Sequence, residues 1–134
     1  MTVFERSTPS AMGELDALTA AVQAFLDAHV DEDLGFRVAL VTSEAVTNAI
    51  EHGNRMDASR SVHLRIEVSN GGGGVRVSVT DEGGGFDPEA VPDPLRASAL
   101  LAEGGRGLFL MRELADELAY EDDGRRVVLT LRPR

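Results

Sequence analysis

The chain has 134 residues, of which 43% are apolar and 27% charged, and its formal net charge at pH 7 is −10. This length and balance predict a single domain over residues 1–134 with a buried core. The acidic charge argues against a nucleic-acid duplex as the main partner, because phosphate binding needs a basic face.

Three absences from the sequence narrow the function classes further. No apolar run reaches membrane-spanning length, the first residues show no signal-peptide pattern, and there is no cysteine. We therefore expect a cytoplasmic protein without membrane contacts, disulfides or thiolate metal sites. All 13 basic residues are arginine, so a Walker-type phosphate loop, which needs a lysine, is excluded.

The sequence pattern predicts a strand followed by two helices in the first half of the chain. Val3–Arg6 is a candidate strand, and apolar residues at helical spacing between Leu15 and Val30 predict a helix with Ser10 as its N-cap. The run 31–35 breaks that pattern. A second helix is predicted from about Phe36 to His52, and Gly53-Asn54 is a typical signal for its C-terminal end.

The second half changes to the period of a strand. Alternating residues over 62–68 and 75–79 predict an antiparallel hairpin, half buried, around a loose turn of four glycines. Residues 86–103 hold three prolines and no clear period, which predicts a long loop or lid. A third helix over 107–118 and a final hairpin around Asp122-Asp-Gly124 complete a two-layer α/β (α+β) sandwich. Its sheet is mixed but mostly antiparallel, with helices on one face.

The second predicted helix carries the first chemical motif. Glu44 and Asn48 are four residues apart and share one face, while the small residues Ala45 and Ala49 lie on the packed side. The Asn48 carbonyl suits Mg²⁺, which takes one or two protein oxygens beside phosphates. Glu44 is placed to accept a proton from an attacking hydroxyl or water. Taken alone, the pair also fits an ordinary exposed helical face. His52 continues this face, where it contacts a phosphate or only the helix dipole.

The second motif is an acid followed by glycines at the end of a strand. Asp81 comes directly after the strand over 75–80, and Gly83 to Gly85 follow it. The carboxylate offers a hydrogen-bond acceptor, and the bare backbone lets a flat ring approach closely. An adenine amino group is the natural donor to it, and a plain Asp-Gly turn is the alternative.

The third motif is a glycine cluster that opens a helix. Gly104, Gly105 and Gly107 precede or begin the helix predicted from residue 107. Free N–H groups at a helix N-terminus bind anions, and glycines allow the backbone to wrap a phosphate. Arg106 either adds charge at the γ-phosphate or points to solvent.

In this order, the three motifs resemble those of the Bergerat-fold (GHKL) ATPases. Glu44-Ala-Val-Thr-Asn48-Ala-Ile-Glu-His52-Gly-Asn54 resembles their N box. Asp81-Glu-Gly-Gly-Gly85 resembles their first glycine box, and Gly104-Gly-Arg-Gly-Leu-Phe-Leu-Met111 their second. Within that superfamily, Ser43-Glu-Ala-Val-Thr-Asn-Ala49 and Gly107-Leu-Phe-Leu-Met-Arg-Glu-Leu-Ala-Asp116 resemble the bacterial anti-sigma factor serine kinases.

The resemblance implies a role for each motif. ATP and Mg²⁺ would be bound, with Glu44 as general base, Asn48 as magnesium ligand and Asp81 as the adenine-binding acid. The adenine pocket would be lined by Gly83 and Gly85. The phosphates would be held by Gly105 and Gly107 under the lid.

The resemblance also implies partners. The family phosphorylates a serine of a STAS-type anti-anti-sigma protein and sequesters a sigma factor, usually as a homodimer. Relatives use charged contacts, arginine included, near the first helix for the partner switch. Here no basic residue lies between Arg6 and Arg37, so the ATP site is better supported than the sigma-binding role.

Two functions follow from different classes. The first is an ATP-dependent serine protein kinase acting as an anti-sigma factor. The second is a module that binds ATP and a protein partner without useful phosphotransfer. An intact Glu44 favours the kinase. A histidine-kinase catalytic domain is disfavoured because the chain has no dimerisation helix pair.

Overall fold

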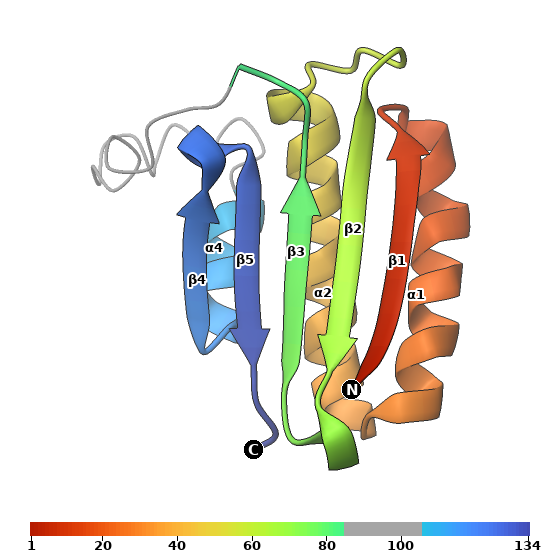
Figure 1. The fold of residues 1–134 in the computed structure, drawn as a ribbon, viewed down its shortest axis with the longest axis vertical. Helices are drawn as coiled ribbons and strands as arrows, with labels where there is room; N and C mark the ends of the chain where they lie inside the picture. Colours follow the sequence, from red (N-terminus) through yellow and green to blue (C-terminus); the bar gives the residue numbers. More distant parts are fainter. Residues whose placement is uncertain (85–105) are drawn as a thin grey trace.

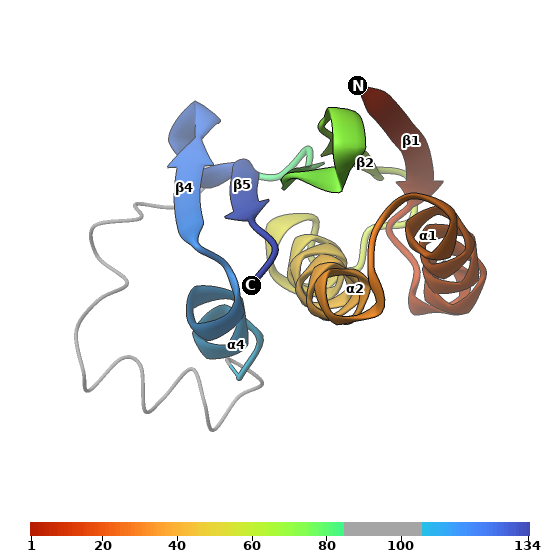
Figure 2. The ribbon, with the colours of Figure 1, turned by 90° about the horizontal axis from the view of Figure 1, so that it is seen from below.

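Five strands form one sheet, and the helices lie on one of its faces (Figures 1 and 2). The structure is a computed structural model that describes residues 1–84 and 106–134. The strands are β1 (Thr2–Pro9), β2 (Ser61–Val68), β3 (Val75–Thr80), β4 (Glu117–Glu121) and β5 (Arg126–Leu131), and the main helices are α1 (Leu15–His29), α2 (Glu32–Asn48) and α4 (Arg106–Leu114). The strand order is β1-β2-β3-β5-β4, and each neighbouring pair is antiparallel. The predicted α+β sandwich is confirmed, although among the described strands the sheet is antiparallel throughout rather than mixed.

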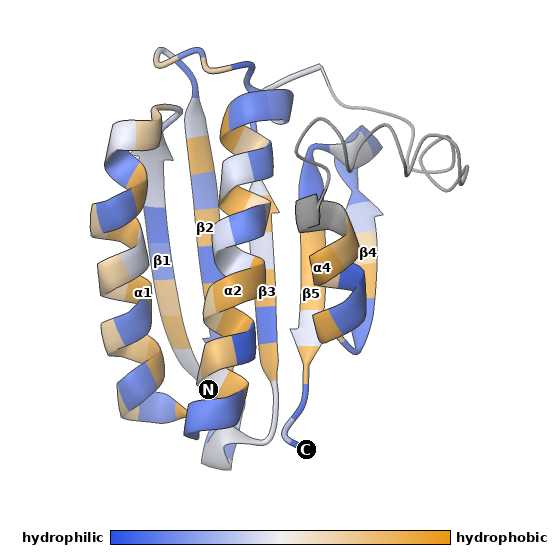
Figure 3. Cartoon of the chain, turned by 180° about the vertical axis from the view of Figure 1, so that it is seen from behind, coloured by the Kyte–Doolittle hydropathy of each residue, from blue (hydrophilic) through white to orange (hydrophobic). Residues whose placement is uncertain are grey.

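The alternating sequence of the middle strands sets the two faces of the sheet. Along β2, apolar and polar residues alternate (Figure 3), and Val62, Leu64 and Ile66 are fully buried toward the helices. Ile66 lies opposite Phe4 of β1 and Val77 of β3. Burying one such side chain contributes about 1.5–3 kcal/mol. The predicted hairpin is therefore confirmed, and this apolar face forms the core with α1 and α2.

The opposite face of the sheet is polar. His63 lies between two side chains of β1, with its Nδ1 2.8 Å from the Ser7 hydroxyl and its Nε2 2.8 Å from a Glu5 carboxylate oxygen. Arg65 contacts Glu5 at 3.1 Å and Glu67 at 2.8 Å. Because these pairs are exposed, each contributes little to stability, and the contacts of Glu5 with His63 and Arg65 join the edge strand β1 to β2.

Helix α2 begins earlier than predicted. It starts at Glu32, because the Asp31 side chain accepts a hydrogen bond from the Leu34 N–H at 2.8 Å and caps the helix. The predicted start near Phe36 is wrong. Glycine commonly breaks helices, but Gly35 lies inside α2. Gly35 is buried inside the helix, and a Cβ there would lie 3.4 Å from Val30 Cγ2. Its small size lets the α1–α2 corner pack closely.

Ser10 does not cap the first helix. A 3₁₀ turn, Met12–Glu14, leads into α1, and the residue before α1 makes no capping hydrogen bond through its side chain. The Ser10 side chain is instead fully buried. The prediction failed because a serine before an apolar run is also suited to a buried hydrogen bond.

The later elements match the predicted order with one shift of boundary. α4 ends at Leu114, four residues before the predicted end, and Leu118 belongs to β4. The turn between β4 and β5 uses positive φ angles at Asp122, Asp123 and Gly124, as an Asp-Asp-Gly turn allows. The predicted lid, 86–103, lies outside the described residues. No helix within the described ranges is long and apolar enough to cross a membrane.

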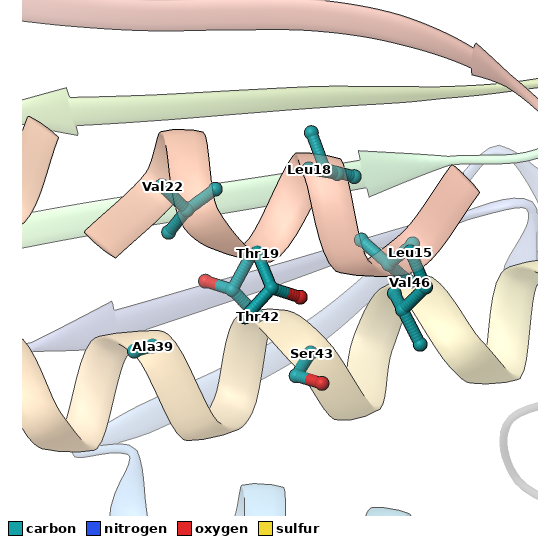
Figure 4. Close-up of a pocket in the computed structure, with 8 residues that line it drawn as sticks. All are labelled: Leu15, Leu18, Thr19, Val22, Ala39, Thr42, Ser43 and Val46. Atoms are coloured by element: carbon teal, nitrogen blue, oxygen red, sulfur yellow. The ribbon is translucent and has the colours of Figure 1, made fainter. Parts of the chain in front are cut away.

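A small apolar pocket separates α1 from α2 (Figure 4). Its lining residues are Leu15, Leu18, Thr19, Val22, Ala39, Thr42, Ser43 and Val46. Within it, the Thr42 hydroxyl is buried and has no hydrogen-bond partner in the part of the chain that the structure describes. A buried hydroxyl without a partner typically costs about 1–3 kcal/mol, so this position weakens the helix–helix contact.

Thr42→Val removes this hydroxyl while nearly keeping the side-chain volume. We expect the free energy of unfolding, measured by urea titration, to rise by about 1 kcal/mol. The control is Thr19→Val on the facing helix, where the residue is exposed and the change should stay within about 0.5 kcal/mol. A loss of stability in Thr42→Val would show that the hydroxyl is hydrogen-bonded in solution.

Candidate functional site

Elements carrying the three motifs meet at one end of the molecule. The C-terminal end of α2, the C-terminal end of β3 and the N-terminal end of α4 lie at the same edge, at the top of Figure 1. α4 packs against α2, and α2 packs against β3. Segments separated by more than 50 residues of sequence thus converge on one region.

The closest of these contacts joins the first two motifs through Asp81. A Cβ placed on Gly53 would lie 2.2 Å from Asp81 Oδ2, and one on Gly83 would lie 1.8 Å from the Gly53 carbonyl oxygen. A Cβ on Gly53 would have to displace the Asp81 side chain, and a Cβ on Gly83 would overlap the Gly53 backbone. Glycine at both positions allows the end of α2, the carboxylate and the following loop to pack this closely.

The Asp81 carboxylate is half buried. Burial raises its pKa above the ordinary value of 3.8, against the opposing effects of the Gly83 hydrogen bond and the charges of Arg125 and Arg60. Oδ1 accepts the Gly83 N–H at 2.8 Å. An anionic oxygen that has lost part of its hydration is a strong acceptor for a ligand N–H group.

Arg125 holds the loop that follows this acid. Its Nε donates to the Gly83 carbonyl at 2.8 Å and its Nη2 contacts the Gly84 carbonyl at 3.5 Å. The Asp81 N–H in turn donates to the Arg125 carbonyl at 2.9 Å. Sequence reasoning missed Arg125, because only the pairing of β3 with β5 brings it beside Asp81. No local motif marks it.

Glu44 and Asn48 lie on α2 below this loop. Both are half buried, and neither side chain has a hydrogen-bond or ionic partner among the described residues. Ala45 and Ala49 are buried, as predicted for the packed side. A carboxylate and a carboxamide one turn apart are thus free to contact a ligand.

His52 belongs to a π-helical turn, Ala49–Gly53, that follows α2 directly. Its side chain is exposed and lies 3.8 Å from the Glu51 carboxylate. A place on the Glu44–Asn48 face and a phosphate contact by His52 both stay predictions.

The remaining predicted residues belong to the second half of the site. Gly85 and Gly105 lie outside the described residues. α4 begins at Arg106 and includes Gly107 in its first turn, so the glycine cluster opens a helix as predicted. Phosphate binding by Gly105, Arg106 and Gly107 stays a prediction.

Comparison with known proteins gives the family. A family model described as a histidine kinase-like ATPase domain matches residues 8–132. The chain belongs to this family. The match agrees with the resemblance of its three motifs to those of GHKL-type ATPases.

Similar proteins fall among the anti-sigma kinases. The chain is 30% identical to the serine-protein kinase RsbW of Bacillus subtilis over 85% of its own length and 72% of that protein. It is 36% identical to the anti-sigma F factor of Geobacillus kaustophilus over 78% of its length and 70% of that protein. Structurally, it resembles the crystal structure of the RsbU and RsbW domains of a Mycobacterium tuberculosis protein, with a TM-score of 0.67 and 19% identity. The match covers all of this chain but only 32% of that longer chain, so it supports the fold alone.

Asp81→Asn tests the electrostatics of the site without a ligand. Because the pKa of Asp81 is raised in the folded state, ionisation destabilises the fold as pH rises above the ordinary carboxyl range. The free energy of unfolding of the wild type should therefore fall relative to that of Asp81→Asn as pH rises from about 4 to about 7. Urea titrations at several pH values measure this difference.

Asp57→Asn is the matched control of opposite sign. Hydrogen bonds from Ser59 lower the pKa of Asp57, so its ionisation stabilises the fold. The stability of Asp57→Asn should therefore fall relative to the wild type as pH rises toward about 4, and the difference should stay constant from about pH 4 to about pH 7. A constant difference between Asp81→Asn and the wild type would contradict the raised pKa of Asp81.

Proposed function

We propose that this protein is an ATP-dependent serine protein kinase that acts as an anti-sigma factor. The observation that carries the proposal is the packing of the Asp81 carboxylate against Gly53, at the edge where the C-terminal end of α2 meets the N-terminal end of α4. The names of its relatives support the same function.

The base of the nucleotide binds at the end of β3 in this proposal. The Asp81 carboxylate accepts the adenine amino group, and Gly83 and Gly85 are proposed to line the pocket of the ring. Partial burial and the Gly83 hydrogen bond support this role, because both limit the positions of the carboxylate.

The triphosphate lies between α2 and the start of α4. The peptide N–H groups around Gly105 and Gly107 and the positive end of the α4 dipole favour the phosphate charge. Arg106 and His52 are candidate additional contacts to the phosphates. Asn48 would offer one oxygen to Mg²⁺, and the ion would supply charge neutralisation at the transferred group.

Glu44 acts as the general base in the transfer step. Its carboxylate takes the hydroxyl proton of the substrate serine as the serine oxygen forms a bond to the γ-phosphorus. The bond from that phosphorus to the β–γ bridging oxygen breaks, and ADP leaves. The half-buried position of Glu44, which has no partner within residues 1–84 and 106–134, supports this role.

Two protein partners and a second copy of the chain belong to the proposal. The substrate serine lies on a STAS-type anti-anti-sigma protein. The kinase also binds and sequesters a sigma factor in this proposal. We expect the kinase to be a cytoplasmic homodimer. Incubation with radiolabelled ATP and the STAS-type protein encoded nearest to it tests the phosphotransfer. ATP binding without transfer to any such protein would favour a binding module instead.

ATP binding is the first measurement. Calorimetry with ATP and Mg²⁺ should detect binding by the wild type, and Asp81→Asn should weaken it by about 1–3 kcal/mol, because the amide places an N–H opposite the adenine amino group. The Asp57→Asn variant should bind as the wild type does. Absence of binding at near-millimolar ATP, where the free energy is only about 4 kcal/mol, would contradict the ATPase site.

Glu44→Gln and Asn48→Ala separate the base from the metal ligand. Glu44→Gln should keep ATP affinity and lose roughly 10²–10⁴-fold in phosphotransfer rate, whereas Asn48→Ala should also weaken magnesium-dependent binding. Glu51→Gln, at an exposed carboxylate beyond the end of the same helix, is the control and should leave both quantities unchanged. Full phosphotransfer by Glu44→Gln would remove the general base from the mechanism.

A further inference from the structure

We propose that Asn54 is a positioning residue that, together with Gly53, sets the Asp81 carboxylate for recognition of the base. The inference rests on the proposed nucleotide site. It adds two residues, Asn54 and Gly53, that act through Asp81 and need not contact the ligand themselves. It follows from how α2 ends and from the hydrogen bonds of one buried amide.

The end of α2 reaches the Asp81 loop through its π-helical turn. The Asn54 N–H donates to the Ala49 carbonyl at 2.8 Å, an i to i−5 bond, and the Met56 N–H donates to the Ile50 carbonyl at 2.7 Å. The chain then turns through positive φ at Arg55 and Met56. Single π turns within helices are uncommon and are frequent at functional sites. Here the wider turn brings Gly53 against the carboxylate.

Asn54 is fully buried and uses its donors and its acceptor. Its Oδ1 accepts the Glu82 N–H at 2.8 Å, while its Nδ2 donates to the Ser10 hydroxyl at 2.5 Å and to the Ser61 carbonyl at 2.9 Å. An amide is the side chain that matches one donor and two acceptors in fixed positions. Aspartate would place a second acceptor against the Ser61 carbonyl.

These bonds fix the backbone on the C-terminal side of Asp81. The Glu82 N–H belongs to the peptide group that directly follows Asp81, so Asn54 fixes that peptide. The preceding peptide is fixed by the bond from the Asp81 N–H to the Arg125 carbonyl. The Gly53 backbone packs so closely against the Asp81 side chain that a Cβ on Gly53 would lie 2.2 Å from Oδ2. This contact limits the positions of the side chain itself. Asp81 therefore has little freedom before a ligand arrives.

This arrangement predicts an effect on base selection rather than on nucleotide binding in general. ITP carries a carbonyl oxygen where ATP carries the exocyclic amino group, so it loses the hydrogen bond to Asp81 and keeps the sugar and phosphates. A displaced carboxylate should therefore lower affinity for ATP and leave affinity for ITP almost unchanged. A general loss of folded protein would lower both affinities by the same factor.

The experiment measures the ratio of ATP to ITP affinity by calorimetry with Mg²⁺ in four proteins. The wild type should prefer ATP, and Asn54→Ala and Gly53→Ala should each lose roughly tenfold of that preference. Val68→Ala, a buried change at the opposite end of β2, is the control for instability and should keep the wild-type ratio. If Asn54→Ala does not fold, Gly53→Ala still tests the proposal.

A second readout does not need a nucleotide. The Glu82 amide should be protected from hydrogen exchange in the ligand-free wild type and in Val68→Ala, and it should exchange faster in Asn54→Ala. A wild-type ATP preference that persists in both Asn54→Ala and Gly53→Ala would overturn the positioning role alone. A wild type that binds ATP and ITP equally would instead overturn base recognition by Asp81, and the proposed site with it.

Discussion

The packing of a carboxylate against a glycine backbone connects the two layers at the candidate site. Asp81 ends a central strand, and Gly53 ends the helix that covers this strand. A Cβ on Gly53 would displace the Asp81 side chain, and a Cβ on Gly83 would overlap the Gly53 carbonyl. Helix, strand and loop must therefore keep one relative position, and the residues one or two turns earlier on α2, Asn48 and Glu44, are placed by that same contact.

The electrostatics of this contact are unfavourable without a ligand. Burial removes part of the hydration of the Asp81 carboxylate and raises its pKa, and the Gly83 N–H, its hydrogen-bond donor among the described residues, replaces only part of the lost water. Arg125 and Arg60 contribute opposing charge at a distance. A ligand that supplies an N–H donor completes the hydrogen bonding of the acid. The strain of partial burial in the empty site thus becomes selectivity for a ligand of matching chemistry.

Local patterns in the sequence predicted the parts of the fold that depend on neighbours in the chain. The alternation over 62–68 identified β2, and the Asp-Asp-Gly turn identified the last hairpin. The predictions failed where one residue type serves two purposes. Ser10 resembled a helix cap and is a buried hydrogen-bond acceptor, while Gly35 resembled a breaker and is a packing contact inside α2.

The candidate site divides in the same way. Glu44, Asn48 and Asp81 were identified because their spacing and their glycine neighbours are local signals. Arg125 and the hydrogen bonds of Asn54 were not, because they join segments 28 to 44 residues apart that only the folded sheet brings together. Gly53-Asn54 was recognised as the end of a helix. That interpretation was correct about the position but did not reveal the π turn or the buried amide.

The place of β3 inside the sheet has a consequence for how long the site survives local opening. β3 is paired on both sides, with β2 and β5, and Asp81 follows its last residue. An interior strand unfolds only when much of the molecule unfolds with it. Edge strands such as β1 and β4 fray at a lower cost in free energy. The acid that we propose to recognise the base is therefore attached to the part of the sheet that should exchange most slowly. Selectivity for the base should persist through partial unfolding that already releases the edges, and it should disappear only with the global transition.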